Sequence, residues 1–406
     1  MMRNMVILGA GTSGALLSNL LSRHLDLDRW WVTVIDRSMH HVYKPGLVFL
    51  PFGMYGYDSE ADVSRDILAP LPDNVRFVAG DIKHIDHQNR VVETDKGDIA
   101  YDFLVSALGC QPDPCTVKGL AEAMGTGDVH TFCTVEGAMR LQGALESFQG
   151  GRLVIDICDV PIKYPVTPFE FAFLADYHFH RKGMRERVEI SLVLPDSDVF
   201  NTNHANRELT RIAELKGIKL VPKFSAAAVD PDAKKLSSRD GRDIEFDLLV
   251  AIPGHVGAKV LDDSGLGDGK GYALTDPRTF KSKHADFVYC MGDNTNVAVS
   301  KAAVAHYLEA GTVLENLLRE MEGQTAEATF QGHASSFIDA GFNKALRIDF
   351  KHDTAPPGDS MPRPGTMTLS RESLPGHLGK LALKWVYWNM LLPGRLTGMP
   401  FLWRLA

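Results

Sequence analysis

The chain has 406 residues, of which 45% are hydrophobic and 23% are charged. This composition can bury the cores of roughly two or three domains, and it excludes a disordered or collagen-like chain. The net charge is −8, with 51 acidic against 43 basic side chains. Without a long basic tract, the chain offers no surface that favours nucleic acid.

The cysteines and the lengths of the apolar runs further limit the class of protein that this chain can be. The five cysteines are an odd number and none forms a CxxC pair, so we expect neither a secreted disulfide scaffold nor a thiolate metal site. The first residues run directly into a folded motif, and we therefore expect no cleaved signal peptide. No apolar run reaches the ~18 residues of a membrane-spanning helix, which leaves membrane contact in the plane of the interface.

The N-terminal segment predicts a nucleotide-binding βαβ unit. Residues 5–8 form a short apolar run typical of a strand buried on both faces, residues 9–14 read Gly-Ala-Gly-Thr-Ser-Gly, and an apolar helical pattern follows. Such glycines permit a tight turn and close approach of a pyrophosphate, which the helix N-terminus favours. Asp36 ends the next predicted strand, where it would accept a hydrogen bond from a ribose hydroxyl. A glycine-rich structural turn is the alternative.

Two later segments carry motifs of their own. Residues 101–109 predict a strand that ends in a turn of small residues, and residues 286–293 predict a strand that ends in Gly292-Asp293. Both resemble the later FAD motifs of flavoproteins with two dinucleotide-binding domains, in which the Gly-Asp carboxylate binds the ribityl chain. The resemblance implies that the nucleotide is FAD. For Asp293 alone, a turn or N-cap aspartate is the alternative.

A second strand opening lacks the glycines that would follow it in nicotinamide-using relatives. Residues 152–157 predict the strand, and residues 158–165 then read Cys-Asp-Val-Pro-Ile-Lys-Tyr-Pro. Side chains here block the approach of a pyrophosphate, and the prolines disfavour an immediate helix start. We expect a second Rossmann-like domain that has lost its NAD(P) site.

The C-terminal region differs from the rest of the chain in its composition. Its last 22 residues hold three of the five tryptophans, and no acidic residue follows Glu372. We interpret residues 378–392 and 397–406 as short amphipathic helices for an anionic membrane face. A hairpin that docks on the body or forms a dimer contact is the alternative. Because the glycine motifs lie elsewhere, the sequence predicts that removing this region leaves the cofactor bound. The basic residues of the region are Lys380, Lys384, Arg395 and Arg404.

Short stretches along the whole chain carry a family resemblance. They are residues 40–46, 161–163, 168–173, 300–302, 337–341 and 385–393. Together with the glycine motifs they resemble the sulfide:quinone oxidoreductase family, including its flavocytochrome c sulfide dehydrogenase relatives. The resemblance implies a flavin enzyme on a membrane surface that takes electrons from a sulfur compound and passes them to a quinone. The expected FAD contacts are Gly9, Gly11, Thr12, Ser13, Gly14, Asp36, Arg37, Lys44, Pro45, Ile82, Ala107, Gly109, Gly292, Asp293 and Lys301.

The chain departs from this family where its redox cysteines fall. Those two positions hold Tyr164 and Ser336, and a third, less central family cysteine matches Cys133. A phenol and an unactivated hydroxyl cannot attack sulfur or add to a flavin near neutral pH as a thiolate does. We therefore expect no disulfide relay, unless the loop of Cys158 brings that thiol to the flavin. For each cysteine, a buried small apolar residue is the alternative.

Further polar residues are candidates for charge and proton handling. Lys301 could stabilise negative charge on a reduced flavin or be a solvated surface lysine. Glu170, on an apolar helix face, would be a proton carrier with a raised pKa or a paired structural ion. His204 and His306 could carry protons to a quinone, although lone histidines are more often structural. The catalytic candidates are Lys301, Glu170, Tyr164, Ser336, Cys158 and Cys133.

The predicted fold class is α/β, with two Rossmann-like domains and C-terminal amphipathic helices. We place the FAD domain in residues 1–110 and 256–330, the degenerate domain in 111–255 and the quinone- and membrane-facing region in 331–406. The expected function is electron transfer from sulfide or a related donor through FAD to a quinone, at the cytoplasmic face of a membrane, with homo-oligomerisation open. The alternatives are a type II NADH dehydrogenase-like quinone reductase and a family member that binds FAD and a partner without turnover.

Overall fold

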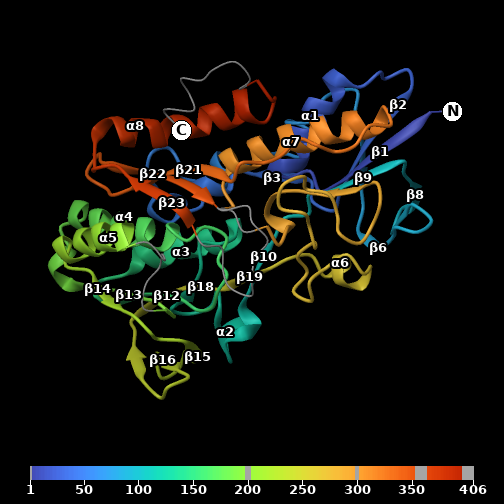
Figure 1. Cartoon of the computed structure of the whole chain (residues 1–406). Coiled ribbons are helices and arrows are strands. Elements are labelled where there is room, and N and C mark those ends of the chain that lie inside the picture. The colour runs from blue at the N-terminus through green and yellow to red at the C-terminus, as the bar shows by residue number, and fades with distance from the viewer. Residues whose placement is uncertain (1, 197–202, 298–300, 353–363, 396–406) are drawn as a thin grey trace.

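Two five-stranded parallel sheets form the frame of the molecule (Figure 1). The computed structural model describes residues 2–196, 203–297, 301–352 and 364–395. Every strand pairing inside the two sheets is parallel. The prediction of an α/β fold with Rossmann-like sheets is confirmed.

The first sheet has the strand order β20-β9-β1-β2-β5. Residues 5–8 of its central strand are fully buried, as expected for a parallel strand covered on both faces. Helices α1 and α7 pack against each other beside this sheet, so residues far apart in the chain build one domain. The elements are β1 (Arg3–Leu8), α1 (Thr12–His24), β2 (Trp30–Asp36), β5 (Arg76–Ala79), β9 (Phe103–Ser106), β20 (Val288–Cys290) and α7 (Ala303–Met321).

The second sheet has the order β11-β18-β12-β13-β14. Helix α4 packs on β12 and β13. The chain passes between the domains at two antiparallel strands that pair with each other, β10 (Gln111–Asp113) and β19 (Gly254–Val256). The elements are β11 (Val129–His130), α3 (Val135–Ser147), β12 (Gly151–Ile157), α4 (Thr167–Arg181), β13 (Val188–Val193), α5 (Asn203–Leu215), β14 (Lys219–Val221) and β18 (Leu248–Ile252).

Three small antiparallel sheets and several short helices complete the fold around the two parallel sheets. Three antiparallel sheets pair β3 with β4, β6 with β7 and β8, and β15 with β16 and β17. The strands are β3 (His40–Val42), β4 (Ser64–Asp66), β6 (Ile82–Asp86), β7 (Val91–Thr94), β8 (Gly97–Ala100), β15 (Ala226–Asp230), β16 (Lys235–Ser238) and β17 (Asp243–Glu245). The short helices are η1 (Lys44–Gly46), η2 (Leu50–Phe52), η3 (Glu60–Asp62), η4 (Pro114–Thr116), α2 (Leu120–Ala123), η5 (Arg185–Arg187), α6 (Lys259–Asp263) and η6 (Gly292–Asn294).

The C-terminal region bridges the two domains. Strand β21 contacts α4 of the second domain and α7 of the first, and helix α8 lies over β21 and β22 (Figure 1). Within the described residues, no helix is both long and apolar enough to cross a bilayer. The elements are β21 (His333–Asp339), β22 (Ala345–His352), β23 (Pro364–Leu369), α8 (Leu374–Val386) and the π-helical turn η7 (Tyr387–Leu391).

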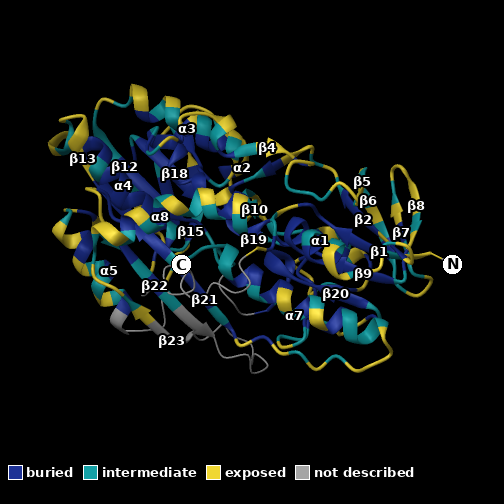
Figure 2. Cartoon of the chain, turned by 90° about the horizontal axis from the view of Figure 1, so that it is seen from above, coloured by how far each residue is buried: buried dark blue, intermediate teal, exposed yellow. Residues whose placement is uncertain are grey.

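One apolar cluster runs through both domains and the C-terminal region (Figure 2). Leu16 of α1, Phe171 of α4 and Leu392 after η7 all belong to it and are fully buried. Burial of such a side chain contributes roughly 1.5–3 kcal/mol. The inner face of α8 and η7 therefore docks on the body. The predicted helix at 397–406 lies outside the described residues.

Candidate active site

The glycine loop after β1 has the geometry of a dinucleotide cradle. Gly9 has a φ of +97°, and a Cβ there would lie 2.5 Å from the Ala107 carbonyl oxygen. A Cβ at Gly14 would lie 1.8 Å from the Gly9 oxygen, whereas one at Gly11 would meet nothing within 4 Å. No side chain caps the N-terminus of α1. The loop thus combines tight packing behind it with open space and free amides in front, which fits a pyrophosphate.

Asp36 stands at the end of β2, beside this loop. Its Oδ2 accepts a hydrogen bond from the Ala10 N–H at 2.7 Å and its Oδ1 accepts one from the Ser38 N–H at 2.8 Å. A carboxylate has about four acceptor positions, so Asp36 can fix the loop and still accept from a ribose hydroxyl.

The Gly292-Asp293 motif meets the first loop directly. A Cβ at Gly292 would lie 2.3 Å from the Ser13 Oγ. The Asp293 carboxylate is buried, forms an ion pair with Lys163 and lies 2.9 Å from the His306 Nε2. Burial alone would raise the pKa of Asp293, but Lys163 and His306 outweigh it and hold that pKa well below its ordinary value. Asp293 is therefore a fixed negative charge rather than a simple turn residue.

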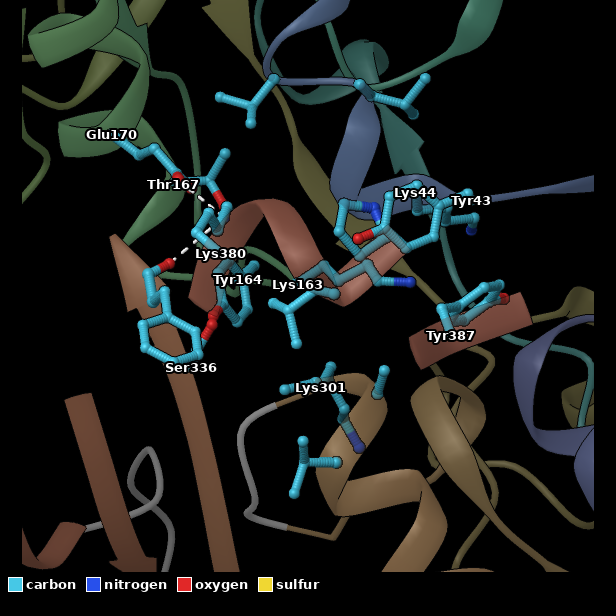
Figure 3. Close-up of a pocket in the computed structure, with 18 of the residues that line it drawn as sticks. Tyr43, Lys44, Lys163, Tyr164, Thr167, Glu170, Lys301, Ser336, Lys380 and Tyr387 are labelled. Carbon is cyan, nitrogen blue, oxygen red and sulfur yellow. Dashed lines mark hydrogen bonds and ion pairs between the residues drawn. The ribbon is translucent and has the colours of Figure 1, made fainter. Parts of the chain in front are cut away.

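A cavity of about 510 Å³ lies where both domains and the C-terminal region meet (Figure 3). Its walls include residues of all three parts of the chain, and apolar side chains dominate them. Predicted site residues on the wall are Thr12, Lys44, Pro45, Cys133, Tyr164, Glu170, Lys301, His306 and Ser336. Residues that are far apart in the sequence thus line one cavity.

Four lysines line this cavity, namely Lys44, Lys163, Lys301 and Lys380 (Figure 3). The neighbouring charge of Lys163, together with burial, lowers the pKa of Lys44 to about 8. For Lys163 itself, burial acts downward, but Asp293 holds its pKa above the ordinary value. The Lys301 Nζ donates to the carbonyl oxygens of Thr295 at 2.9 Å and Val297 at 3.2 Å. Lys301 is therefore held by the loop before α7, not solvated at the surface.

The two positions that the resemblance predicts to match redox cysteines, Tyr164 and Ser336, both line the cavity. Tyr164 follows β12 and Ser336 lies on β21, and both side chains line the same wall (Figure 3). The Tyr164 hydroxyl is buried. Burial and the Glu170 carboxylate raise the pKa of Tyr164 well above its ordinary value. Tyr164 is therefore a neutral phenol at any physiological pH.

The five cysteines are all free. Cys133 lines the cavity, and burial raises its pKa to about 11. Cys158 is buried, is absent from the cavity wall, and has a pKa that burial raises well above its ordinary value. The loop therefore does not bring Cys158 to the cavity, and the small-apolar interpretation fits it.

Glu170 belongs to a buried charge network that sequence reasoning missed. The Lys380 Nζ lies 2.6 Å from the Glu170 Oε1, which also accepts the Asp339 N–H at 2.9 Å. The Asp339 Oδ2 lies 2.7 Å from the His377 Nδ1. Burial raises the pKa of Glu170 although Lys380 opposes it. The sequence predicts that Lys380 is one of the cations that face a membrane. This prediction is wrong, because Lys380 is buried and pairs with Glu170, whose apolar surroundings favour a buried counter-ion.

The remaining predicted residues lie around the site or apart from it. Arg37 is exposed after β2, Ile82 packs in β6, and Ala107 and Gly109 follow β9. The side chain of His204 lies outside the described part. Nothing in the geometry tests which of these residues contacts a cofactor, so their assignments stay predictions.

Similarity to known proteins covers nearly the whole chain. No model of a known protein family matches the sequence. The mitochondrial sulfide:quinone oxidoreductase of Mus musculus is 24% identical, with 98% of this chain and 88% of the mouse protein aligned. The sulfide:quinone oxidoreductase of Aquifex aeolicus has a similar structure, with a TM-score of 0.84 and 18% identity over 98% of this chain and 94% of that one. The chain fits the sulfide:quinone oxidoreductase family.

These similarities support an oxidoreductase and leave the electron donor open. A type II NADH:quinone oxidoreductase of Staphylococcus epidermidis is 30% identical, but over only 125 residues, which are 30% of this chain and 29% of that protein. The similarity to the mouse sulfide:quinone oxidoreductase, by contrast, extends over 98% of this chain.

Proposed function

We propose that this chain is a membrane-surface FAD oxidoreductase that passes two electrons from a small sulfur compound to a quinone. The observation that supports it is the composition of one cavity wall. Thr12 of the dinucleotide loop, Tyr164 and Ser336 at the family's cysteine positions, and apolar residues of α8 all line the same space. A cofactor, a donor and an acceptor could meet there.

The cofactor end of the site would be held by the first domain. Bound FAD would take the electron pair from the donor and give it to the quinone. The glycine loop and the N-terminus of α1 would bind its pyrophosphate, and Asp36 a ribose hydroxyl. Lys163 and Lys301 place positive charge on the wall of the cavity, where it would stabilise a reduced, anionic cofactor.

The quinone end would be formed by β21 and α8. Phe337, Leu378 and Leu383 line the cavity there with few polar groups, as expected for an apolar ring with a lipid tail. Quinone reduction also consumes two protons. The pair of Lys380 Nζ and Glu170 Oε1 holds a proton at this wall, and we propose that it supplies one of them.

The part of the site where the electron donor would react differs from that of sulfide:quinone oxidoreductases, because it lacks their two redox cysteines. Among the cavity-lining residues of the described chain, Cys133 is the one thiol, and its raised pKa keeps it protonated. Tyr164 and Ser336 cannot hold sulfur covalently at neutral pH. The proposal is therefore that the donor reduces the flavin without a protein disulfide relay.

A nicotinamide donor is disfavoured by the loop after β12. Its residues Ile162, Lys163 and Tyr164 line the cavity, and the loop contains no glycine that would let a pyrophosphate approach the backbone. We therefore expect no rapid reduction by NADH or NADPH.

Anaerobic mixing tests the proposal. The FAD-loaded protein is mixed with sulfide, polysulfide, a thiol or sulfite, and separately with NADH, and flavin absorbance is followed before and after quinone is added. The proposal predicts bleaching by at least one sulfur compound and recovery with quinone. Bleaching by NADH alone would favour the NADH dehydrogenase-like alternative, and bleaching by dithionite alone, with no quinone response, the binding-only role.

A further inference from the structure

A buried chain of hydrogen bonds joins the C-terminal segment to the dinucleotide loop. The Tyr387 hydroxyl lies 2.8 Å from the Thr12 Oγ1 and 2.7 Å from the His41 Nε2. The His41 Nδ1 lies 3.0 Å from the Ala10 carbonyl oxygen. Tyr387 and His41 are both nearly fully buried. Residues separated by more than 300 positions in the sequence therefore share one polar contact.

The chemistry of the partners fixes the direction of each hydrogen bond. Only an N–H can face the Ala10 carbonyl, so the His41 Nδ1 carries a proton. Burial lowers the pKa of His41 to about 4, which leaves its Nε2 as an acceptor. The Tyr387 O–H must then donate to that nitrogen, and the Thr12 O–H donates to the Tyr387 oxygen. Neither His41 nor Thr12 can exchange its donor or acceptor role toward Tyr387 without the loss of one of these hydrogen bonds.

The same loop is fixed from its other side. The Ala10 N–H donates to Asp36 at 2.7 Å while the Ala10 carbonyl accepts from His41. Thr12 is the first residue of α1 and also lines the cavity. The loop that would cradle a pyrophosphate is thus held between β2 and the C-terminal segment.

Other contacts hold residues 374–395, which we call the C-terminal latch, along helix α1. Arg23, near the end of α1, donates to the Pro393 carbonyl at 2.6 Å and the Gly394 carbonyl at 3.1 Å. A second element also holds the latch, since the guanidinium of Arg65 on β4 lies 4.2 Å from the Trp388 ring centroid. The latch therefore contacts both ends of α1, with Tyr387 at the end that faces the cavity.

We propose that Tyr387 is a positioning residue that couples docking of the C-terminal latch to cofactor occupancy of the dinucleotide loop. Coupling of this kind is reciprocal: a cofactor that orders the loop favours the docked latch, and a docked latch tightens cofactor binding by the same factor. The inference rests on the FAD binding proposed above. It predicts, against the expectation from sequence, that removal of the latch weakens FAD binding.

The test measures both sides of the coupling on the full chain. Hydrogen–deuterium exchange of residues 374–395 is compared with and without FAD, and the FAD dissociation constant is determined by flavin fluorescence. Wild-type protein should show slower exchange in the latch when FAD is bound. Tyr387→Phe removes one donor and one acceptor between neutral groups, so FAD binding should weaken roughly fivefold to twentyfold. The FAD-dependent protection of the latch should shrink in the same variant.

A matched control separates coupling from general loss of stability. Trp385 lies on α8, just before Tyr387, and its ring is exposed, so Trp385→Leu should leave both the dissociation constant and the protection unchanged. A merely structural role for Tyr387 would lower thermal stability without changing the FAD-dependent protection, and that result overturns the inference.

The outcomes distinguish this inference from the proposed function. If wild-type protein takes up no FAD at all, the proposed function fails. If FAD binds but exchange in the latch does not respond to it, the coupling is absent, whether or not Tyr387→Phe folds. Equal dissociation constants for wild type and Tyr387→Phe would contradict the coupling as well.

Discussion

Four strands of each parallel sheet follow the same order, β9-β1-β2-β5 in the first and β18-β12-β13-β14 in the second, but the two sheets present different chemistry at their carboxyl ends. After β1 the chain makes a glycine loop with open space at Gly11, whereas after β12 it places Ile162, Lys163 and Tyr164 on the cavity wall. One edge can admit a pyrophosphate and the other supplies side chains to a site. A sheet can therefore keep its strand order while the loop after it loses the ability to bind a nucleotide.

The largest expected effect comes from closing the open loop. Gly11 has a φ of −68° and caps α1, so Gly11→Asp fits the backbone and adds a favoured N-cap. Its carboxylate would repel the pyrophosphate, and FAD binding should weaken at least roughly 100-fold by fluorescence titration. Thermal stability of the FAD-free protein should not fall. Gly143→Asp, at an open position on α3, is the control, and equal losses in both variants would contradict the assignment of the loop.

The second sheet should also differ in its response to pH. Strand β1 is apolar where it approaches its loop, but β12 buries Asp156, and burial raises the pKa of this carboxyl to about 7. A raised carboxyl pKa contributes stability that is present at low pH and is lost as pH rises through about 7. Asp156→Asn should remove this decline and gain on the order of 2 kcal/mol at pH 8 relative to pH 5, measured by urea unfolding. Exposed Asp232→Asn is the control, and an unchanged pH slope in Asp156→Asn would refute the assignment.

Restoring thiols tests the side chains that the second domain and β21 bring to the cavity. The double change Tyr164→Cys with Ser336→Cys supplies the residue types that can add sulfur and reduce a flavin. Sulfide-dependent bleaching should become at least roughly tenfold faster than in either single variant, because the relay needs both thiols. Anaerobic stopped-flow absorbance measures it. No gain over the single variants would mean that these positions do not cooperate at the flavin.

The smallest expected effect concerns the outer face of α8. Its Leu374 and Trp385 side chains are more than half exposed, and we expect them to enter the interface of an anionic bilayer. Trp385→Ser should reduce binding to phosphatidylglycerol-containing vesicles several-fold in a flotation assay. Trp31, also half exposed but on β2, gives the control Trp31→Ser. If both variants bind as wild type does, α8 is not the membrane face.

Local sequence patterns predicted much of the fold and the glycine loop at the cavity. The apolar run at residues 5–8 and the glycines that follow depend on near neighbours, so periodicity and backbone sterics predict them. The pair of Glu170 and Lys380 joins α4 to α8, which both pack on β21, and no local pattern encodes that arrangement. The sequence nevertheless contained a signal, since a carboxylate on an apolar helix face requires a partner from elsewhere. Tyr387 and His41 gave no such signal, because each fits an ordinary apolar core.

The central claim is that one cavity brings a flavin to a quinone, and it can be tested without knowing the donor. FAD-loaded protein is reduced with dithionite under anaerobic conditions and mixed with a short-chain ubiquinone in a stopped-flow instrument. We predict that oxidised-flavin absorbance returns within seconds, and that Lys380→Met slows this return at least roughly tenfold while FAD stays bound. A reduced flavin that persists in the presence of quinone, or a protein that takes up no FAD, would contradict the account.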